Sequence, residues 1–118
     1  MDPARDKRHS QRHRCSLPIE LRRYGSSYPL RGATSDLSPR GCYVSLSSAL
    51  AVGTLVDVVL WVGDTKLAFR GTVRTADVNV GNGIDFTGIT DEQRTRLQRY
   101  LDEIQARPAA SSDIIFWK

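Results

Sequence analysis

The chain has 118 residues, of which 40% are hydrophobic, 25% charged and 8% aromatic, and its net charge is +4. This length suits one domain with a modest core, and the composition is ordinary for a globular protein. No apolar stretch is long enough to cross a bilayer, and the N-terminus is densely charged, so we expect a cytoplasmic protein without a membrane span. Cys15 and Cys42 lie on alternating segments and are interpreted as buried thiols rather than a disulfide.

Basic residues gather near the N-terminus. Residues 1–31 hold eight lysines and arginines against three acidic residues, whereas the rest of the chain holds nine against ten. A basic segment on a near-neutral body indicates an anionic partner that binds at one place. Nucleic acid, an anionic membrane and a phosphorylated small molecule all satisfy this requirement.

The predicted elements begin after an arm over residues 1–14, which lacks apolar periodicity and is expected to be flexible. Strict alternation over 15–22 predicts a half-buried strand, in which Pro18 marks an edge or the start of pairing. Segment 36–41 is rich in turn residues and is expected to be a loop. Further strands are predicted over 28–34, 42–47, 55–62, 66–76 and 84–86.

Strand 55–62 is apolar on both of its faces, so we expect it to be central and covered on both sides. Gly63-Asp64 then predicts a hairpin turn. Thr90 to Gln93 matches a capping box, and the following apolar spacings of three and four predict a helix that ends at Arg107-Pro108.

Six short strands followed by one helix predict a mainly β fold, a small six-stranded antiparallel β-barrel with a C-terminal α-helix over an open end. The barrel and helix are assigned to residues 15–106 and a tail to 107–118. The tail contains an apolar run, Ile114–Trp117, that is expected to dock onto the domain or onto another chain.

Two segments carry the candidate chemistry. Arg8 and Arg12 stand four residues apart just before the first strand, and Asp36, Ser38 and Gly41 form a D-x-S-x-x-G pattern. An arginine fork matches either two phosphate oxygens or O6 and N7 of guanine, and a carboxylate accepts from guanine N1–H and N2–H. A hydroxyl adds an adaptable bond, and a glycine lets the backbone approach a flat ligand. Either segment alone is more typical of a solvated tail or an ordinary turn.

Together, the two motifs resemble those of the PilZ domain family, bacterial receptors of cyclic di-GMP. The resemblance includes Leu17-Pro18 at the start of a strand and a G-x-G-φ-x-F strand at 81–86, and it covers about residues 8–104. It implies that Arg8 and Arg12 wrap the phosphates and guanines, while Asp36 and Ser38 hold a guanine from the barrel surface.

The resemblance also implies a ligand rather than a cofactor, and a receptor whose arm changes conformation on binding and regulates a downstream bacterial process. The downstream protein is not identified by the sequence. An intercalated ligand dimer is common in such domains, although this sequence does not determine the stoichiometry. Gly41 belongs to the same site, and Arg14 and Arg40, which flank the motifs, are candidate additional contacts.

Other function classes fit less well. No triad, nucleophile elbow or paired-carboxylate pattern indicates an enzyme. His9, His13 and Cys15 lack a fourth ligand for a metal site. A barrel that binds single-stranded nucleic acid should present clustered aromatics, and the tyrosines at 24, 28 and 43 are not grouped with the arm. A PilZ-like adaptor that acts through protein contacts remains an alternative.

Overall fold

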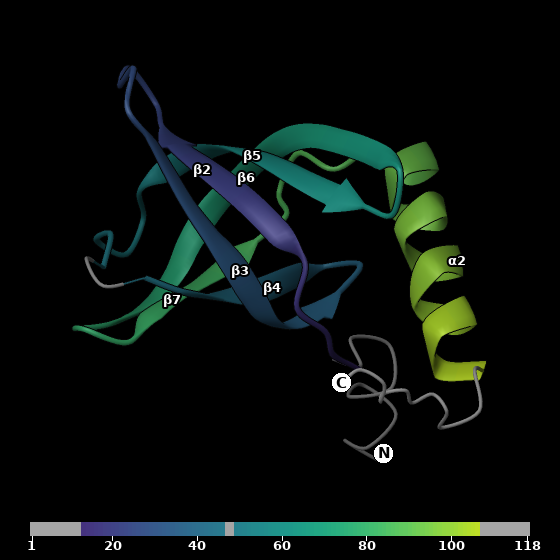
Figure 1. Cartoon of the computed structure of the whole chain (residues 1–118). Coiled ribbons are helices and arrows are strands. Elements are labelled where there is room, and N and C mark those ends of the chain that lie inside the picture. Colours follow the sequence, from purple (N-terminus) through teal and green to yellow (C-terminus); the bar gives the residue numbers. More distant parts are fainter. Residues whose placement is uncertain (1–12, 47–48, 107–118) are drawn as a thin grey trace, which may run out of the picture.

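The computed structural model describes residues 13–46 and 49–106 of the chain. Its sheet has the strand order β1-β3-β2-β5-β6-β7-β4, with a further pairing between β3 and β4. Strands β2 to β7 therefore close into a six-stranded antiparallel barrel, as predicted (Figure 1), and β1 pairs with β3. The elements are β1 (His13–Arg14), β2 (Pro18–Arg23), β3 (Pro29–Ser38), β4 (Gly41–Ser45), β5 (Leu55–Val62), β6 (Thr65–Asp77), β7 (Gly81–Asp85) and α2 (Asp91–Ala106).

Alternating side chains fill the barrel. In β5, Val56, Val58 and Leu60 are fully buried, whereas Leu55 is 49% exposed. The expectation that this strand is covered on both faces is wrong, because its second face lies on the outside of a closed barrel. The apolar residues on the outer face of β5 are therefore exposed or only partly buried, and its buried residues point into the ring.

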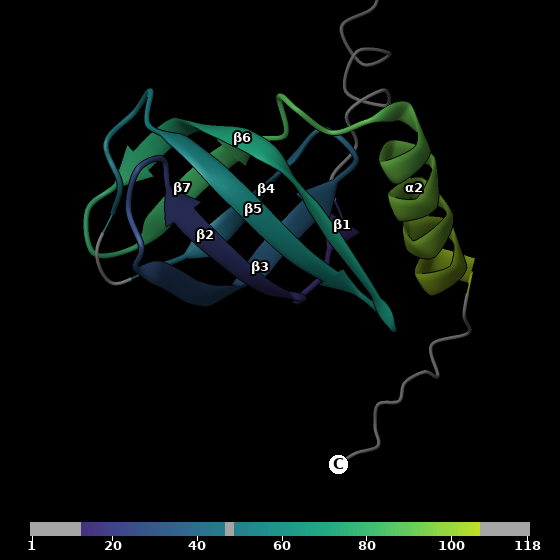
Figure 2. The same cartoon turned by 90° about the horizontal axis from the view of Figure 1, so that it is seen from above.

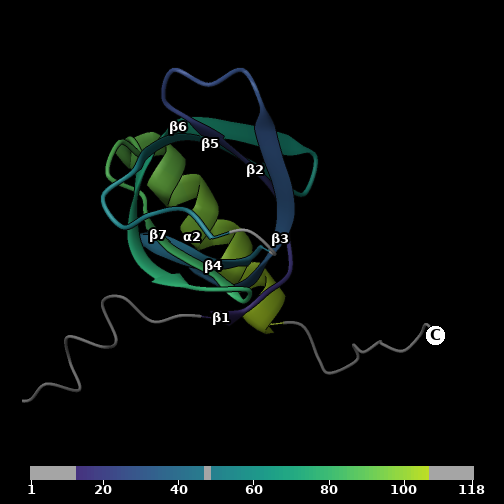
Figure 3. The same ribbon diagram turned by 90° about the vertical axis from the view of Figure 1, so that its left-hand side faces the viewer.

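Helix α2 covers one end of the barrel. It lies behind the ring when the barrel is viewed end-on (Figure 3), with Leu97 and Leu101 buried in the same core as the strands. The predicted capping box is present: the backbone N–H of Gln93 donates to Thr90 Oγ1 (3.1 Å), and the backbone N–H of Thr90 donates to Gln93 Oε1 (2.9 Å). The helix starts at Asp91 because this box satisfies the first unpaired amides.

The opposite end of the barrel carries the β2–β3, β4–β5 and β6–β7 connections (Figure 2). Antiparallel order places these three connections together, since every second connection returns to the same end. In the described part of the chain, the large hydrophobic side chains that are exposed lie in or beside these connections: Tyr24, Tyr28, Val52, Leu55, Val78 and Val80. The two ends of the barrel therefore differ: helix α2 covers one, and exposed hydrophobic side chains lie at the other.

Several boundaries differ from the predictions. The first barrel strand starts at Pro18 rather than Cys15, which agrees with proline at the start of pairing. Strand β3 continues to Ser38 through the segment that was expected to be a loop, and β7 starts at Gly81 rather than Ile84. Both cysteines are thiols, as expected, but only Cys42 is buried. No helix within residues 13–46 and 49–106 is long and apolar enough to span a membrane.

Candidate ligand-binding site

Strand β1 lies between the two predicted motifs in the sequence and pairs with the strand that carries Asp36. It pairs with the end of β3, so that Arg14 lies directly opposite Asp36 and His13 opposite Leu37. Arg14 was expected in a flexible arm, but it belongs to this short strand. Arg8 and Arg12 lie outside the described residues. The described part of the chain begins at His13, the residue after Arg12, and it begins beside the edge of β3 that carries Asp36.

A β-bulge turns Asp36 toward the outside of the barrel. The register between β3 and β4 shifts between Thr34 and Asp36, which leaves Ser35 as the extra residue. Strict alternation from the buried Thr34 would have placed Asp36 inside, but Leu37 is inside instead, at 0% exposure. Asp36 thus lies half-buried on the outer face, where a bulge commonly aims a functional side chain.

Ser38 is buried, with 1% exposure, and shapes the turn that follows it. Its Oγ accepts from the backbone N–H of Arg40 (3.1 Å) and donates to the carbonyl of Gly41 (3.4 Å). The turn between β3 and β4 consists of Pro39 and Arg40, and the Arg40 side chain is exposed. The serine therefore has a structural role within the motif, beside the ligand contact that the resemblance implies.

The structure explains why residue 41 is glycine. A Cβ atom at this position would lie 2.3 Å from the carbonyl oxygen of Ile84, on the neighbouring strand β7. Real side chains do not tolerate so close a contact with a backbone atom. The close pairing of β4 with β7 thus requires glycine here, whether or not a ligand approaches.

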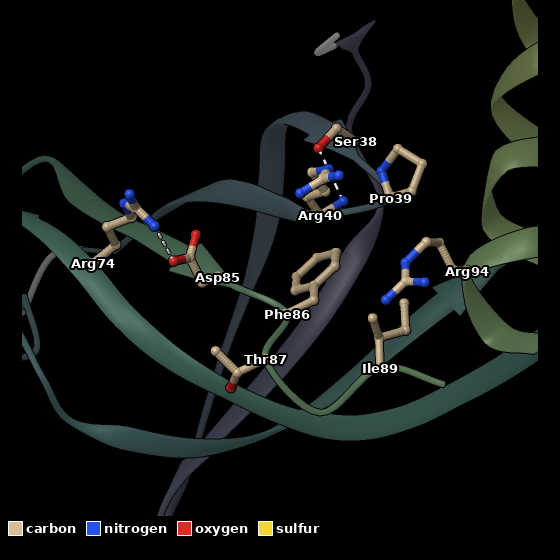
Figure 4. A pocket seen from close by; sticks show the side chains of 9 residues that line it. All are labelled: Ser38, Pro39, Arg40, Arg74, Asp85, Phe86, Thr87, Ile89 and Arg94. Carbon is tan, nitrogen blue, oxygen red and sulfur yellow. Dashed lines mark hydrogen bonds and ion pairs between the residues drawn. The ribbon is translucent and has the colours of Figure 1, made fainter. Parts of the chain in front are cut away.

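Two hollows that share Arg74 and Asp85 adjoin the segment 36–41. The larger, of about 650 Å³, lies between the β3–β4 turn and the start of α2 (Figure 4). Its lining residues are Ser38, Pro39, Arg40, Arg74, Asp85, Phe86, Thr87, Ile89 and Arg94. The smaller, of about 350 Å³, is lined by Asp36, Tyr43, Arg74, Thr75, Gly83, Ile84 and Asp85. Since Arg74 and Asp85 line both hollows, the two form one continuous surface.

The sequence did not indicate Tyr43, Arg74, Asp85 or Arg94 as site residues. Tyr43 lies opposite Asp36 in the β3–β4 register, so this tyrosine is close to the motif. Its phenol donates to Asp77 Oδ2 (2.6 Å). This hydrogen bond, together with desolvation and the charges of Asp77 and Asp36, raises the pKa of Tyr43 to about 12. The phenol thus stays neutral over the whole physiological range.

Three arginines give the larger hollow its charge. Arg40 and Arg94 approach it from the β3–β4 turn and from α2, and Arg74 approaches from β6 (Figure 4). Arg94 also forms an ion pair with Asp91 (2.7 Å). Guanidinium groups on an open surface bind phosphates and guanine edges well. The arrangement therefore favours an anionic, partly flat ligand.

The PilZ domain family model matches residues 6–103. The chain belongs to the PilZ domain family. PilZ domains are receptors of cyclic di-GMP that bind rather than catalyse. The match begins before the described residues and includes both motifs, Arg8/Arg12 and Asp36 to Gly41.

Solved PilZ structures share the fold. The PilZ domain of CeSA from a cellulose-synthesizing bacterium is 23% identical, with a TM-score of 0.63, over 81% of this chain and 99% of that domain. The motility inhibitor MotI/DgrA of Bacillus subtilis is 14% identical, with a TM-score of 0.69, over 82% of this chain. This PilZ chain spans about half (51%) of the MotI chain. Curated protein sequences show no match.

Proposed function

We propose that this PilZ chain is a receptor that binds cyclic di-GMP on the outer barrel face where β1, β3 and β4 meet. The observation that carries the proposal is the pairing of Arg14 with Asp36, because it joins the chain that follows Arg12 to the strand that presents the aspartate. Arg8 and Arg12 would hold phosphates and guanine edges, and Asp36 and Ser38 would hold a guanine from the barrel. Arg14 and Arg40 are further candidate contacts.

The proposal includes a change in the arm. Residues 1–14 carry five basic side chains, which repel one another until an anion is present. A ligand that binds the arm and barrel together would favour the closed arrangement, and a downstream protein could respond to it. Amide exchange of residues 1–12 should therefore slow when cyclic di-GMP is added, and equal exchange in both states would contradict the switch.

Calorimetric titration with cyclic di-GMP tests the binding. The wild-type chain should bind with a Kd of about a micromolar or tighter, and Arg12→Ala should weaken binding by roughly tenfold or more, since a charge-assisted bidentate contact contributes about 1–3 kcal/mol. Arg23→Ala is the matched control, because this arginine lies at the far end of β2. An Arg12→Ala variant that binds as the wild type does would place the site elsewhere.

Cyclic di-AMP separates base recognition from charge attraction in the same titration. Its phosphates are identical, but adenine lacks the N2 amine that Asp36 would accept from and presents an amine in place of guanine O6. Unpaired polar groups cost about 1–3 kcal/mol each, so discrimination should reach about a hundredfold. Comparable affinities for the two dinucleotides would mean that Asp36 does not recognise the base. Binding would then depend only on the basic arm, and its affinity would fall steeply with salt concentration.

A further inference from the structure

Arg74 is the extra residue of a second β-bulge. In the β6–β7 pairing Val73 lies opposite Ile84 and Thr75 opposite Gly83, so Arg74 has no partner residue in the register. The inner face takes Val73, at 1% exposure, and both following residues are exposed on the outside. Bulges redirect side chains and gather near functional sites. This one places a guanidinium on the outer face that also presents Asp36.

The side chain of Arg74 adjoins both hollows of the candidate site. In the smaller hollow it shares the lining with Asp36 and Tyr43, and in the larger with Ser38 and Arg40. A ligand that extends from Asp36 in the smaller hollow to Ser38 in the larger would therefore lie close to Arg74. Neither sequence motif contains Arg74. This residue lies near the Asp36 segment because β7 and β4 connect β6 to β3 in the closed sheet.

Asp85 holds Arg74 in its present position. Arg74 Nη1 forms a hydrogen-bonded ion pair with Asp85 Oδ2, and the side chains are 69% and 32% exposed (Figure 4). Exposed ion pairs of this kind contribute little to stability. A ligand phosphate offers the guanidinium the same two-oxygen geometry as the carboxylate does. Exchanging one for the other thus costs the fold little.

We propose that Arg74 is an additional ligand-binding arginine of this receptor and that Asp85 competes with the ligand for it. The proposal rests on the proposed binding of cyclic di-GMP. In the ligand-free protein Asp85 neutralises Arg74, and on binding the guanidinium moves to a phosphate or a guanine edge of the ligand. Asp85 then lowers the affinity without touching the ligand, and the identity of this residue adjusts the concentration at which the receptor responds.

A second ion pair on the same strand provides the control. Arg70 of β6 faces Asp57 of β5 at 3.8 Å, with side chains that are 61% and 52% exposed. The Arg70 guanidinium lies 4.5 Å from the centre of the Tyr24 ring, and neither member of the pair lines the two hollows. Removing a charge from this pair changes the net charge as much as the same change at Arg74 or Asp85 does.

The test is a titration of cyclic di-GMP into the wild type and four variants: Arg74→Ala, Arg74→Lys, Asp85→Asn and the double variant of Arg74→Ala with Asp85→Asn. Arg74→Ala should weaken binding by about tenfold, the factor that 1.4 kcal/mol represents. Asp85→Asn should tighten it several-fold, and the double variant should bind as Arg74→Ala does. Arg74→Lys, which keeps the charge but loses the fork, should fall between the wild type and Arg74→Ala.

The controls Arg70→Ala and Asp57→Asn should bind within about twofold of the wild type, since long-range charge at an exposed site is screened by salt. Wild-type affinity in Arg74→Ala would overturn the inference and leave the proposed function standing. So would an Asp85→Asn effect that persists in the double variant, because Asp85 would then act through another group. A wild-type chain that binds no cyclic di-GMP would overturn both.

Discussion

Thr34 ties the segment between β1 and β2 to the barrel. Its buried hydroxyl accepts from the backbone N–H of Leu17 (2.9 Å) and donates to the carbonyl of Cys15. The backbone N–H of Thr34 in turn donates to the carbonyl of Leu17 (3.0 Å). The Thr34 side chain thus satisfies a backbone donor and a backbone acceptor in the segment between β1 and β2, which is not part of a strand. Thr34 itself lies two residues before Asp36.

Replacing Thr34 with valine should lower the free energy of unfolding by about 1–3 kcal/mol, because a buried N–H and a carbonyl lose their partner while the shape is kept. Denaturant unfolding measures the change. Thr34→Ser keeps the hydroxyl and should lose less. A valine variant as stable as the wild type would show that water replaces the hydroxyl.

The phenol of Tyr43 gives the site a pH signature. Its pKa of about 12 lies above the ordinary value of 10, mainly because of the hydrogen bond to Asp77. The neutral form is therefore favoured by folding, so this contribution to stability is fully present below pH 10 and is lost as the pH rises through about 12.

An absorbance titration of phenolate formation checks this assignment, with Tyr43→Phe identifying the late-titrating tyrosine. Asp77→Asn should move the pKa of Tyr43 toward its ordinary value, because the amide is uncharged and its oxygen is a weaker acceptor. An unchanged titration in Asp77→Asn would mean that burial, rather than the hydrogen bond, holds the proton.

At the scale of elements, the start of α2 is coupled to the barrel through one glutamine. Besides closing the capping box with Thr90, the side-chain amide of Gln93 donates to the carbonyl of Ala68 in β6 (2.9 Å). The box therefore sets both where the helix begins and how its first turn sits against the strand.

Thr90→Ala should lower the free energy of unfolding by about 1 kcal/mol, the usual effect of removing an N-cap hydroxyl. Gln93→Ala should cost more, since it also breaks the link to β6, whereas Thr90→Ser should be close to neutral. Denaturant unfolding of the three variants gives the order. A Gln93→Ala variant less affected than Thr90→Ala would contradict the coupling.

Elements with an undisturbed period could be predicted from the sequence. The alternation of β2 and the spacing of Leu97 and Leu101 in α2 follow directly from the core that they fill. Strand β5 was predicted from its β-rich apolar run, which did not reveal that one face lies outside the barrel. Strand β3 could not be delimited in the same way, because its bulge at Ser35 breaks the alternation directly after the predicted strand 28–34. Strand β1 has two residues and no period, so only its pairing with β3 defines it.

At the scale of the whole molecule, the six-stranded barrel and its helix were predicted, and the candidate site was predicted in part. The motif residues Asp36, Ser38 and Gly41 are local in sequence. Tyr43 and Arg74 join them only because β4, β7 and β6 are neighbours in the closed sheet. Contacts made by strand order are invisible to local patterns, so no period or motif in the sequence pointed to Arg74.

The pairing of β1 with β3 has a consequence for how the arm reaches its target. Because β1 pairs with β3, the arm is tethered to the barrel close to Asp36. Arg8 stands five residues before His13, so their Cα atoms are never more than about 18 Å apart in any conformation of the chain. A group held within such a radius acts at an effective concentration on the order of millimolar. If the arm closes on the ligand as proposed, this closure would be unimolecular and independent of protein concentration, and a separate peptide with the same arginines would have to be supplied at millimolar levels to replace it.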